Sequence, residues 1–153
     1  MISWPAPRDP PTRILFACNH NSIRSPMAAA LTCQLFGARL VVDSVGVFAG
    51  EPSHFAAAVM EEVGIDLSSH KPKSFDKLED PDFDLVISLT PEAHHSVAEL
   101  TRTMNCAFEY WPTMDPTLVD GSRETILSAY RSARATLTER IKTRFSYRPR
   151  PSG

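Results

Sequence analysis

The hydrophobic positions along the chain alternate between short continuous runs and stripes at helical spacing. The runs are rich in branched apolar side chains, which is typical of strands buried on both faces of a parallel sheet. They lie at residues 13–17, 40–44, 85–89 and 106–108. The stripes repeat every three to four residues and predict helices. They lie at residues 25–36, 53–63, 90–101 and 122–143.

The alternation of strands and helices predicts an α/β fold, with a parallel sheet covered on both faces by crossover helices. The 153 residues are enough for one domain with a buried core. We expect this domain to occupy residues 13–146. A flexible proline-rich arm, residues 1–12, should precede it, and a disordered tail, residues 147–153, should follow it.

The charge and cysteine content narrow the setting in which the protein works. Its formal net charge of −2 gives no reason to expect nucleic acid or a membrane surface as a partner. No apolar run approaches the roughly 20 residues that span a bilayer, and the start of the chain lacks the pattern of a signal peptide. Three widely spaced cysteines fit a reducing cytoplasm better than a disulfide framework. We therefore expect a cytoplasmic protein. No group of His, Cys or Asp residues has the spacing of metal ligands, so we expect neither a metal nor another cofactor.

The strongest chemical signal lies where the first predicted strand ends and the first predicted helix begins. The strand ends at Cys18, and the helix follows at Arg24, Ser25 and Pro26. The intervening loop consists of Asn19, His20, Asn21, Ser22 and Ile23. The N–H groups of such a loop and of the helix N-terminus form a cradle for an anion, and Arg24 adds a two-pronged donor. Ser25 could cap the helix, with Pro26 in its first position.

This arrangement predicts a cysteine nucleophile. N–H dipoles and a guanidinium both favour the thiolate form of Cys18. The predicted ligand of the cradle is a tetrahedral oxyanion such as phosphate, sulfate or arsenate. The implied chemistry is attack of Cys18 on that bound group.

The same segment resembles the phosphate-binding loop of the low-molecular-weight protein tyrosine phosphatases and of the related thioredoxin-coupled arsenate reductases. The resemblance extends from about residue 13 to about residue 141 and implies a four-stranded sheet in the order 2-1-3-4. It also implies roles for individual side chains. Asn21 would hold the loop in an unusual backbone conformation, Ser44 and His70 would hydrogen-bond to the loop, and Ser25 would donate to the sulfur.

Phosphate transfer to a thiolate needs an acid that protonates the leaving oxygen. The chain offers three Asp-Pro pairs, of which Asp9 lies in the arm and Asp80 precedes the third predicted strand. Asp115 follows the fourth strand and so lies at the same sheet edge as Cys18, where Pro116 favours an extended conformation. In the resembled family an Asp-Pro in this loop is the general acid. We therefore expect Asp115 to protonate the leaving group and then to activate water.

The sequence departs from the phosphotyrosine enzymes where an aromatic wall is usual. Thr117 and Leu118 follow the Asp-Pro pair in place of aromatic residues, which leaves phosphotyrosine specificity open. Phe48, Tyr110 and Trp111 are candidates for another substrate wall, although each could equally pack in the core.

Three functions remain open from the sequence. The first is a phosphomonoester hydrolase that forms a cysteinyl-phosphate, acting on phosphotyrosine or on another aryl or protein phosphate. The second is an arsenate reductase, because the spacing from Trp111 to Asp115 looks like that branch. The paired cysteines of its internal relay are absent after the third strand, and Cys33 and Cys106 are predicted to be core thiols, so an external thiol would be needed. The third is a phosphate-binding or phosphoprotein-binding module without turnover.

Several arginines recur along the last predicted helix and the tail: Arg131, Arg134, Arg140, Arg144, Arg148 and Arg150. They could form a docking surface for an acidic partner. A solvated helix face is the preferred interpretation.

Overall fold

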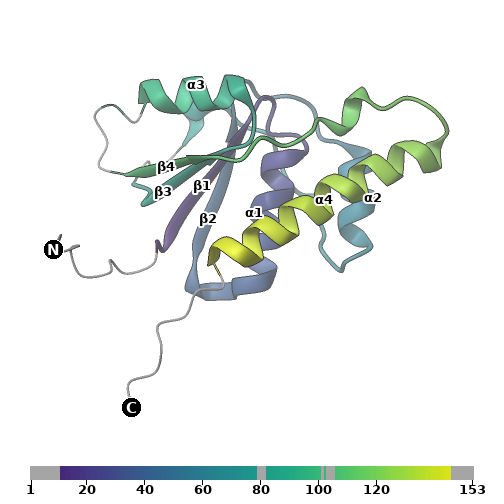
Figure 1. Ribbon diagram of the computed structural model, residues 1–153, viewed down its shortest axis with the longest axis horizontal. Helices are drawn as coiled ribbons and strands as arrows, with labels where there is room; N and C mark the ends of the chain where they lie inside the picture. Colours follow the sequence, from purple (N-terminus) through teal and green to yellow (C-terminus); the bar gives the residue numbers. More distant parts are fainter. Residues whose placement is uncertain (1–10, 79–81, 101, 103–105, 146–153) are drawn as a thin grey trace, which may run out of the picture.

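The computed structural model describes residues 11–78, 82–100, 102 and 106–145, in which strands and helices alternate (Figure 1). The strands are β1 (Arg13–Cys18), β2 (Val41–Gly46), β3 (Leu85–Ser88) and β4 (Ala107–Tyr110). The α-helices are α1 (Arg24–Phe36), α2 (His54–Glu61), α3 (Pro91–Leu100) and α4 (Arg123–Phe145). Short 3₁₀ helices lie at Gly37–Arg39, Phe75–Lys77 and Pro116–Leu118.

The strands form one parallel sheet in the order β2-β1-β3-β4. This confirms the predicted α/β class and strand order. Strand β1 is central because its side chains are apolar on both faces: Ile14 and Phe16 belong to one core cluster, and Leu15 and Ala17 to the other. Since all the strands are parallel, their carboxyl ends share one edge, and Cys18 stands at that edge beside Gly46.

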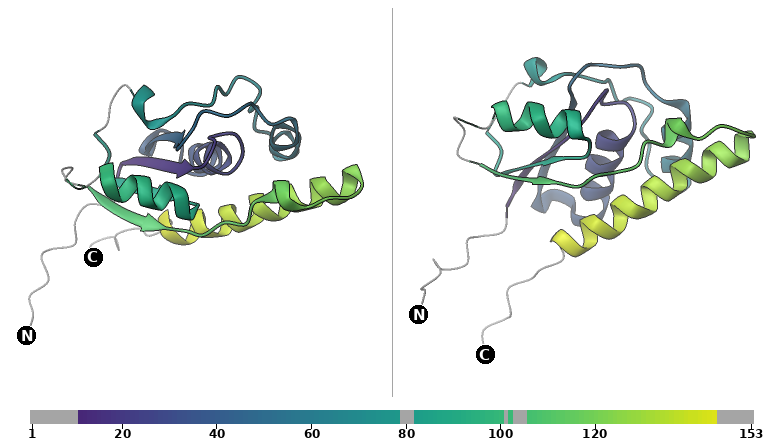
Figure 2. Two further views of the ribbon diagram at one scale, coloured as in Figure 1. Left: turned by 90° about the horizontal axis from the view of Figure 1, so that it is seen from above. Right: turned by 45° about the horizontal axis from the view of Figure 1, so that its top comes forward.

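Helices cover both faces of the sheet, as predicted (Figure 1). Helices α1, α2 and α4 pack on one face, and α3 packs against β1 and β3 on the other. Helix α4 packs against α1, α2 and the sheet through buried side chains at helical spacing: Leu127, Tyr130, Ala133, Leu137, Ile141 and Phe145. Figure 2 shows the segment that follows β4 running beside α4 in the opposite direction. That path brings residues 111–118 from the sheet edge towards the N-terminal half of α4.

Helix α1 differs from the prediction on one side. Cys33 is exposed, so it is not a core residue. At about 100° per residue, Cys33 lies about 240° around the helix from the buried Met27 and therefore points away from the sheet. Cys106 is half-buried and packs against the core cluster that contains Leu15 and Ala17, so the prediction of a core thiol was wrong for Cys33 only.

The arginines of α4 do not simply form a solvated face. Arg131 and Arg134 each approach the carboxylate of Glu62 to 2.8 Å, and Arg144 reaches Glu109 at the same distance. Hydrogen bonds from Arg131 and Arg134 lower the pKa of Glu62 to about 2. These ion pairs attach α4 to the end of α2 and to β4, and they correct the sequence interpretation for three of the six arginines.

Some predicted features lie outside the described residues: the arm except for its last two positions, the tail, Asp9, Asp80, Arg148 and Arg150. At the described end of the arm, the N–H and the hydroxyl of Thr12 both donate to the carboxylate of Asp84. Across the described part of the chain, no helix combines the length and the apolar character needed to cross a membrane.

Candidate active site

The thiol of Cys18 lies at the base of the loop between β1 and α1. Cys18 is 2% exposed, and its Sγ is 2.9 Å from the Oγ of Ser25. Ser25 is not the helix cap that the sequence suggested. Helix α1 already begins at Arg24, and the cap position, Ile23, makes no side-chain capping bond. Because Ser25 lies in the first turn, its hydroxyl points inward to the sulfur.

Asn21 fixes the shape of the loop. Its φ of 56° is in the left-handed region, which is costly for most residues other than glycine but which asparagine adopts more readily than the others. Its Nδ2 donates to the hydroxyls of Ser25 and Ser44, both at 2.9 Å, and its Oδ1 accepts from the N–H of Lys73 at 2.9 Å. The Nε2 of His70 lies 2.8 Å from the Asn21 carbonyl oxygen. The structure thus brings together the side chains that the resemblance implied, and adds Lys73.

The main chain of the loop is hydrogen-bonded on its outer side. The carbonyls of Cys18, Asn19 and His20 accept from the N–H groups of residues 47, 48 and 50 at 2.8–2.9 Å. Gly46 allows this close approach, because a Cβ there would lie 2.6 Å from the Asn21 nitrogen. In the described part of the chain, no N–H of residues 19–23 donates to another main-chain carbonyl. These amides are therefore available for an anion.

Arg24 connects the loop to the segment after β4. Its guanidinium donates to the Thr113 carbonyl oxygen at 2.9 Å and lies 3.7 Å from the carboxylate of Asp115. The Arg24 side chain is 11% exposed and that of Asp115 is 32% exposed. The predicted acid and the predicted anion-binding arginine are therefore in contact at one sheet edge.

The environment of Asp115 favours its ionised form. Its carboxylate caps the 3₁₀ helix by accepting from the N–H of Thr117 at 2.9 Å and from the Thr117 hydroxyl at 2.6 Å. Partial burial raises the pKa of Asp115, but the two hydrogen bonds from Thr117 and the charges of Arg24 and His20 outweigh it. The net effect is a pKa below the usual range for an aspartate.

The three candidates for a substrate wall lie in different environments. Trp111 is 6% exposed and packs edge-on against Phe16 at 5.9 Å, so it is a core residue and the prediction for it was wrong. Tyr110 is half-buried and stacks on His94 with the ring centres 4.7 Å apart. Phe48 is 63% exposed on the segment that pairs with the loop. Two other exposed apolar side chains flank the Asp115 position: Met114 and Leu118.

Comparison with known proteins identifies the family of the chain. Residues 13–144 match the family described as low molecular weight phosphotyrosine protein phosphatase. The chain belongs to this family. It is 32% identical over 131 residues to the glutaredoxin arsenate reductase of Synechocystis, which covers 85% of this chain and 93% of the relative.

Solved structures of the phosphatase family share the fold. An arsenate reductase in its oxidized state matches with a TM-score of 0.73 and 27% identity, over 88% of this chain and 97% of that one. The arginine phosphatase of Geobacillus stearothermophilus matches with a TM-score of 0.70 and 30% identity, over 86% of this chain and 89% of that one. The matched members of the family are therefore enzymes with different named activities.

The other two thiols are remote from the family's phosphate loop. Cys106 directly precedes β4 and lies at the amino edge of the parallel sheet, opposite Cys18. Cys33 lies nine residues after Arg24 on α1, or roughly 14 Å further along the helix axis. Desolvation raises the pKa of both thiols. Neither is placed to form a disulfide with Cys18.

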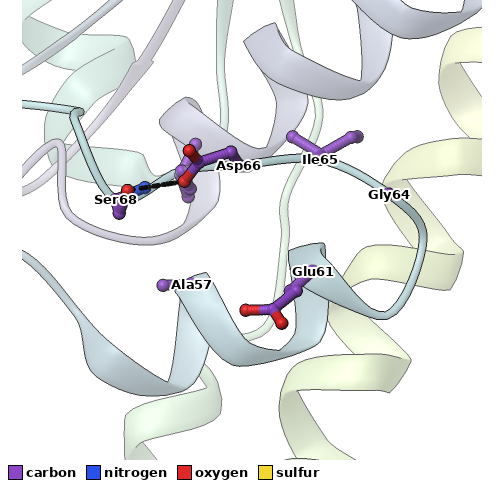
Figure 3. A pocket seen from close by; sticks show the side chains of 7 residues that line it. Ala57, Glu61, Gly64, Ile65, Asp66 and Ser68 are labelled. Carbon is purple, nitrogen blue, oxygen red and sulfur yellow. Dashed lines mark hydrogen bonds between the residues drawn. The ribbon is translucent and has the colours of Figure 1, made fainter.

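A separate hollow of about 430 Å³ lies between the end of α2 and the segment that follows it (Figure 3). It is lined by Ala57, Glu61, Gly64, Ile65, Asp66, Leu67 and Ser68. The carboxylate of Asp66 is already bonded to the N–H and the hydroxyl of Ser68. None of the predicted site residues lines this hollow. Throughout the described ranges, no group of three or more His, Cys, Asp or Glu side chains is arranged to hold a metal ion.

Sequence reasoning missed several contacts of the site. Lys73 and Thr113 contribute main-chain groups, which carry no side-chain signal. Thr90 and Glu92 contact the loop from the N-terminal turn of α3. They lie about 70 residues from the loop in sequence, so no local pattern links them to it.

Proposed function

We propose that this protein is a phosphatase that cleaves phosphomonoesters through a cysteinyl-phosphate intermediate. The observation that carries the proposal is the convergence of three groups at one sheet edge: the Cys18 thiol, the Arg24 guanidinium and the Asp115 carboxylate. The proposed substrates are phosphotyrosine and other aryl or protein phosphates. The reduced thiol that this chemistry needs fits the predicted cytoplasmic location.

In the first half-reaction, the Cys18 thiolate attacks the phosphorus atom. A sulfur–phosphorus bond forms while the bond to the leaving oxygen breaks, and that oxygen takes a proton from Asp115. The Ser25 hydroxyl, 2.9 Å from the sulfur, can donate to the thiolate. The loop amides and Arg24 would bind the equatorial oxygens of the phosphoryl group.

Asp115 must gain a proton before it can act as an acid. A bound dianionic phosphoryl group supplies negative charge beside Asp115 and competes for Arg24, the nearest cation. Both effects raise the pKa of a carboxyl group. In the second half-reaction the Asp115 carboxylate accepts a proton from water, the water oxygen bonds to phosphorus, and the bond to Cys18 breaks. Inorganic phosphate is released and the thiolate is restored.

The test is hydrolysis of p-nitrophenyl phosphate, a phosphotyrosine peptide and phosphoarginine by the wild type, Cys18→Ser and Asp115→Asn. We expect the wild type to hydrolyse p-nitrophenyl phosphate, the phosphotyrosine peptide or both, and Cys18→Ser to hydrolyse neither. Loss of the acid should cost roughly 10²–10⁴-fold, with the smallest effect on p-nitrophenyl phosphate because its leaving group needs the least protonation. Hydrolysis that survives in Cys18→Ser would refute the cysteinyl-phosphate route.

Arsenate reduction with an external thiol is the second candidate function. It is supported by the relative named glutaredoxin arsenate reductase and by the positions of Cys33 and Cys106, which leave no internal thiol beside Cys18. Cys18 would attack arsenate and lose water, and an external thiol would then attack the Cys18 sulfur. The sulfur–arsenic electron pair leaves with arsenite, a mixed disulfide remains on Cys18, and a second thiol reduces it.

The two functions separate in a parallel assay. Arsenate reduction is followed with glutathione, mycothiol, glutaredoxin or thioredoxin as the thiol source. Arsenite formation without aryl phosphate hydrolysis would replace the phosphatase proposal by the reductase one. Phosphate binding with neither activity would favour the third hypothesis, a binding module without turnover.

A further inference from the structure

The loop is held at a second point, on the side opposite Asn21. The side-chain amide of Asn19, the residue directly after Cys18, donates to the carboxylate of Glu92 at 3.0 Å. Its Oδ1 accepts from the hydroxyl of Thr90 at 2.6 Å. Thr90 is 1% exposed, and its hydroxyl oxygen also accepts from the N–H of Ala93 in the first turn of α3. Both polar ends of the Asn19 side chain are therefore attached to α3.

These contacts restrain the anion-binding part of the loop. Asn21 attaches the loop to β2 and to the segment around His70, whereas Asn19 attaches it to α3 on the other face of the sheet. The Asn19 carbonyl is held as well, because it accepts from the N–H of Phe48 at 2.8 Å. With both its side chain and its carbonyl bonded, Asn19 fixes the peptide planes on either side of itself. Those planes carry N–H groups of the cradle.

We propose that Asn19, Thr90 and Glu92 form a positioning network that sets the affinity of the phosphate loop for its oxyanion. The proposal rests on the proposed function only in that the loop binds an oxyanion. Glu92 is exposed, so its contact with Asn19 contributes little to packing. A carboxylate near an anion site opposes binding, but the N-terminus of α3 offsets part of that charge. Glu92 therefore acts as an acceptor that orients Asn19.

A pair of variants separates the acceptor from the charge. Glu92→Gln and Glu92→Ala both remove the negative charge, but only glutamine keeps an oxygen that can accept from Asn19. The affinity of each variant for inorganic phosphate is measured as protection of Cys18 against iodoacetamide, with alkylation followed on the Cys18 peptide because Cys33 is also exposed. This readout needs no turnover. Asn19→Ala is a third variant, and the melting temperature is recorded for all.

We expect Glu92→Ala to need about three- to tenfold more phosphate than Glu92→Gln for half-maximal protection, which is the effect of losing one hydrogen bond. Asn19→Ala should match or exceed the Glu92→Ala effect. In hydrolysis assays the same factor should appear mainly in KM. Equal protection in Glu92→Ala and Glu92→Gln, or wild-type protection in Asn19→Ala, would overturn the proposal.

Failure of the proposed function gives a different result. If phosphate protects the wild type but no substrate is hydrolysed, the phosphatase proposal fails while the difference between the two Glu92 variants still tests the network. If phosphate does not protect Cys18 in the wild type, the network has no oxyanion affinity to set and the proposal is overturned.

Discussion

Substitution of Asn21 should reveal how much of the stability of the protein is used to hold the phosphate loop in shape. Asn21→Gly removes three side-chain hydrogen bonds, to Ser25, Ser44 and the Lys73 N–H, but leaves a residue that tolerates the φ of 56°. At about 1 kcal/mol for each bond, the free energy of unfolding should fall by about 3 kcal/mol. Asn21→Ala loses the same bonds but, unlike glycine, keeps a Cβ in the left-handed region, so it should be roughly 1 kcal/mol less stable than Asn21→Gly.

The assay is urea denaturation of the wild type and both variants, followed by tryptophan fluorescence. Ser22→Ala is a matched loop control, because the Ser22 hydroxyl makes only a long contact of 3.4 Å to the His20 carbonyl oxygen. We expect this control to stay within about 0.5 kcal/mol of the wild type. If Asn21→Ala is as stable as Asn21→Gly, the left-handed conformation at this position carries no strain that glycine relieves. If both variants match the wild type, the three hydrogen bonds of Asn21 do not stabilise the fold either.

Three further predictions follow from other contacts. Thr117→Val removes a hydroxyl donor that lowers the pKa of Asp115. The alkaline limb of the pH–rate profile, where the acid loses its proton, should therefore move to higher pH. An unmoved limb would exclude Asp115 as the acid. Glu62→Gln should lower the melting temperature at pH 7. Because the folded-state pKa of Glu62 is depressed to about 2, that difference should be complete above pH 4.5 and vanish as the pH falls through about 2, and a constant difference would contradict the ion-pair account. Gly46→Ala places a Cβ 2.6 Å from the Asn21 nitrogen and should reduce the affinity for phosphate at least tenfold in the protection assay. Unchanged affinity would show that the loop can shift to accommodate the Cβ without losing its binding geometry.

The layers of the fold could be predicted from the sequence because the strands appear in it as short, continuous apolar runs. Strand β1 is apolar at every position between Ile14 and Cys18, so it could only be central, and the helices beside it carry clear apolar stripes. The strand expected at residues 40–44 spans Val41–Gly46, and no element differs by more than two residues at either end. The strand order itself came from the family resemblance and not from the pattern.

The wrong predictions concern residues whose environment is decided by contacts far away in the sequence or by their face of a helix. Trp111 follows a strand that ends at Tyr110, and only the packing of Phe16 and Phe145 against its ring shows that it faces the core. The ion pairs of Glu62 with α4 join residues 69 and 72 positions apart, and no local pattern reports such a contact. Cys33 was an avoidable error, since helical geometry alone places it opposite the buried stripe.

The hydrogen bonds around Asn21 and Asn19 mean that the sequence of the phosphate loop does not by itself determine the conformation of the loop. Its conformation depends on hydroxyls, an imidazole and amides that come from β2, from residues 70–73 and from α3. A synthetic peptide with the loop sequence, or the same residues grafted onto another strand–helix junction, would carry the thiol and the guanidinium without the left-handed turn that orients the amides. Transfer of this chemistry to a new scaffold therefore requires transfer of the surrounding contacts.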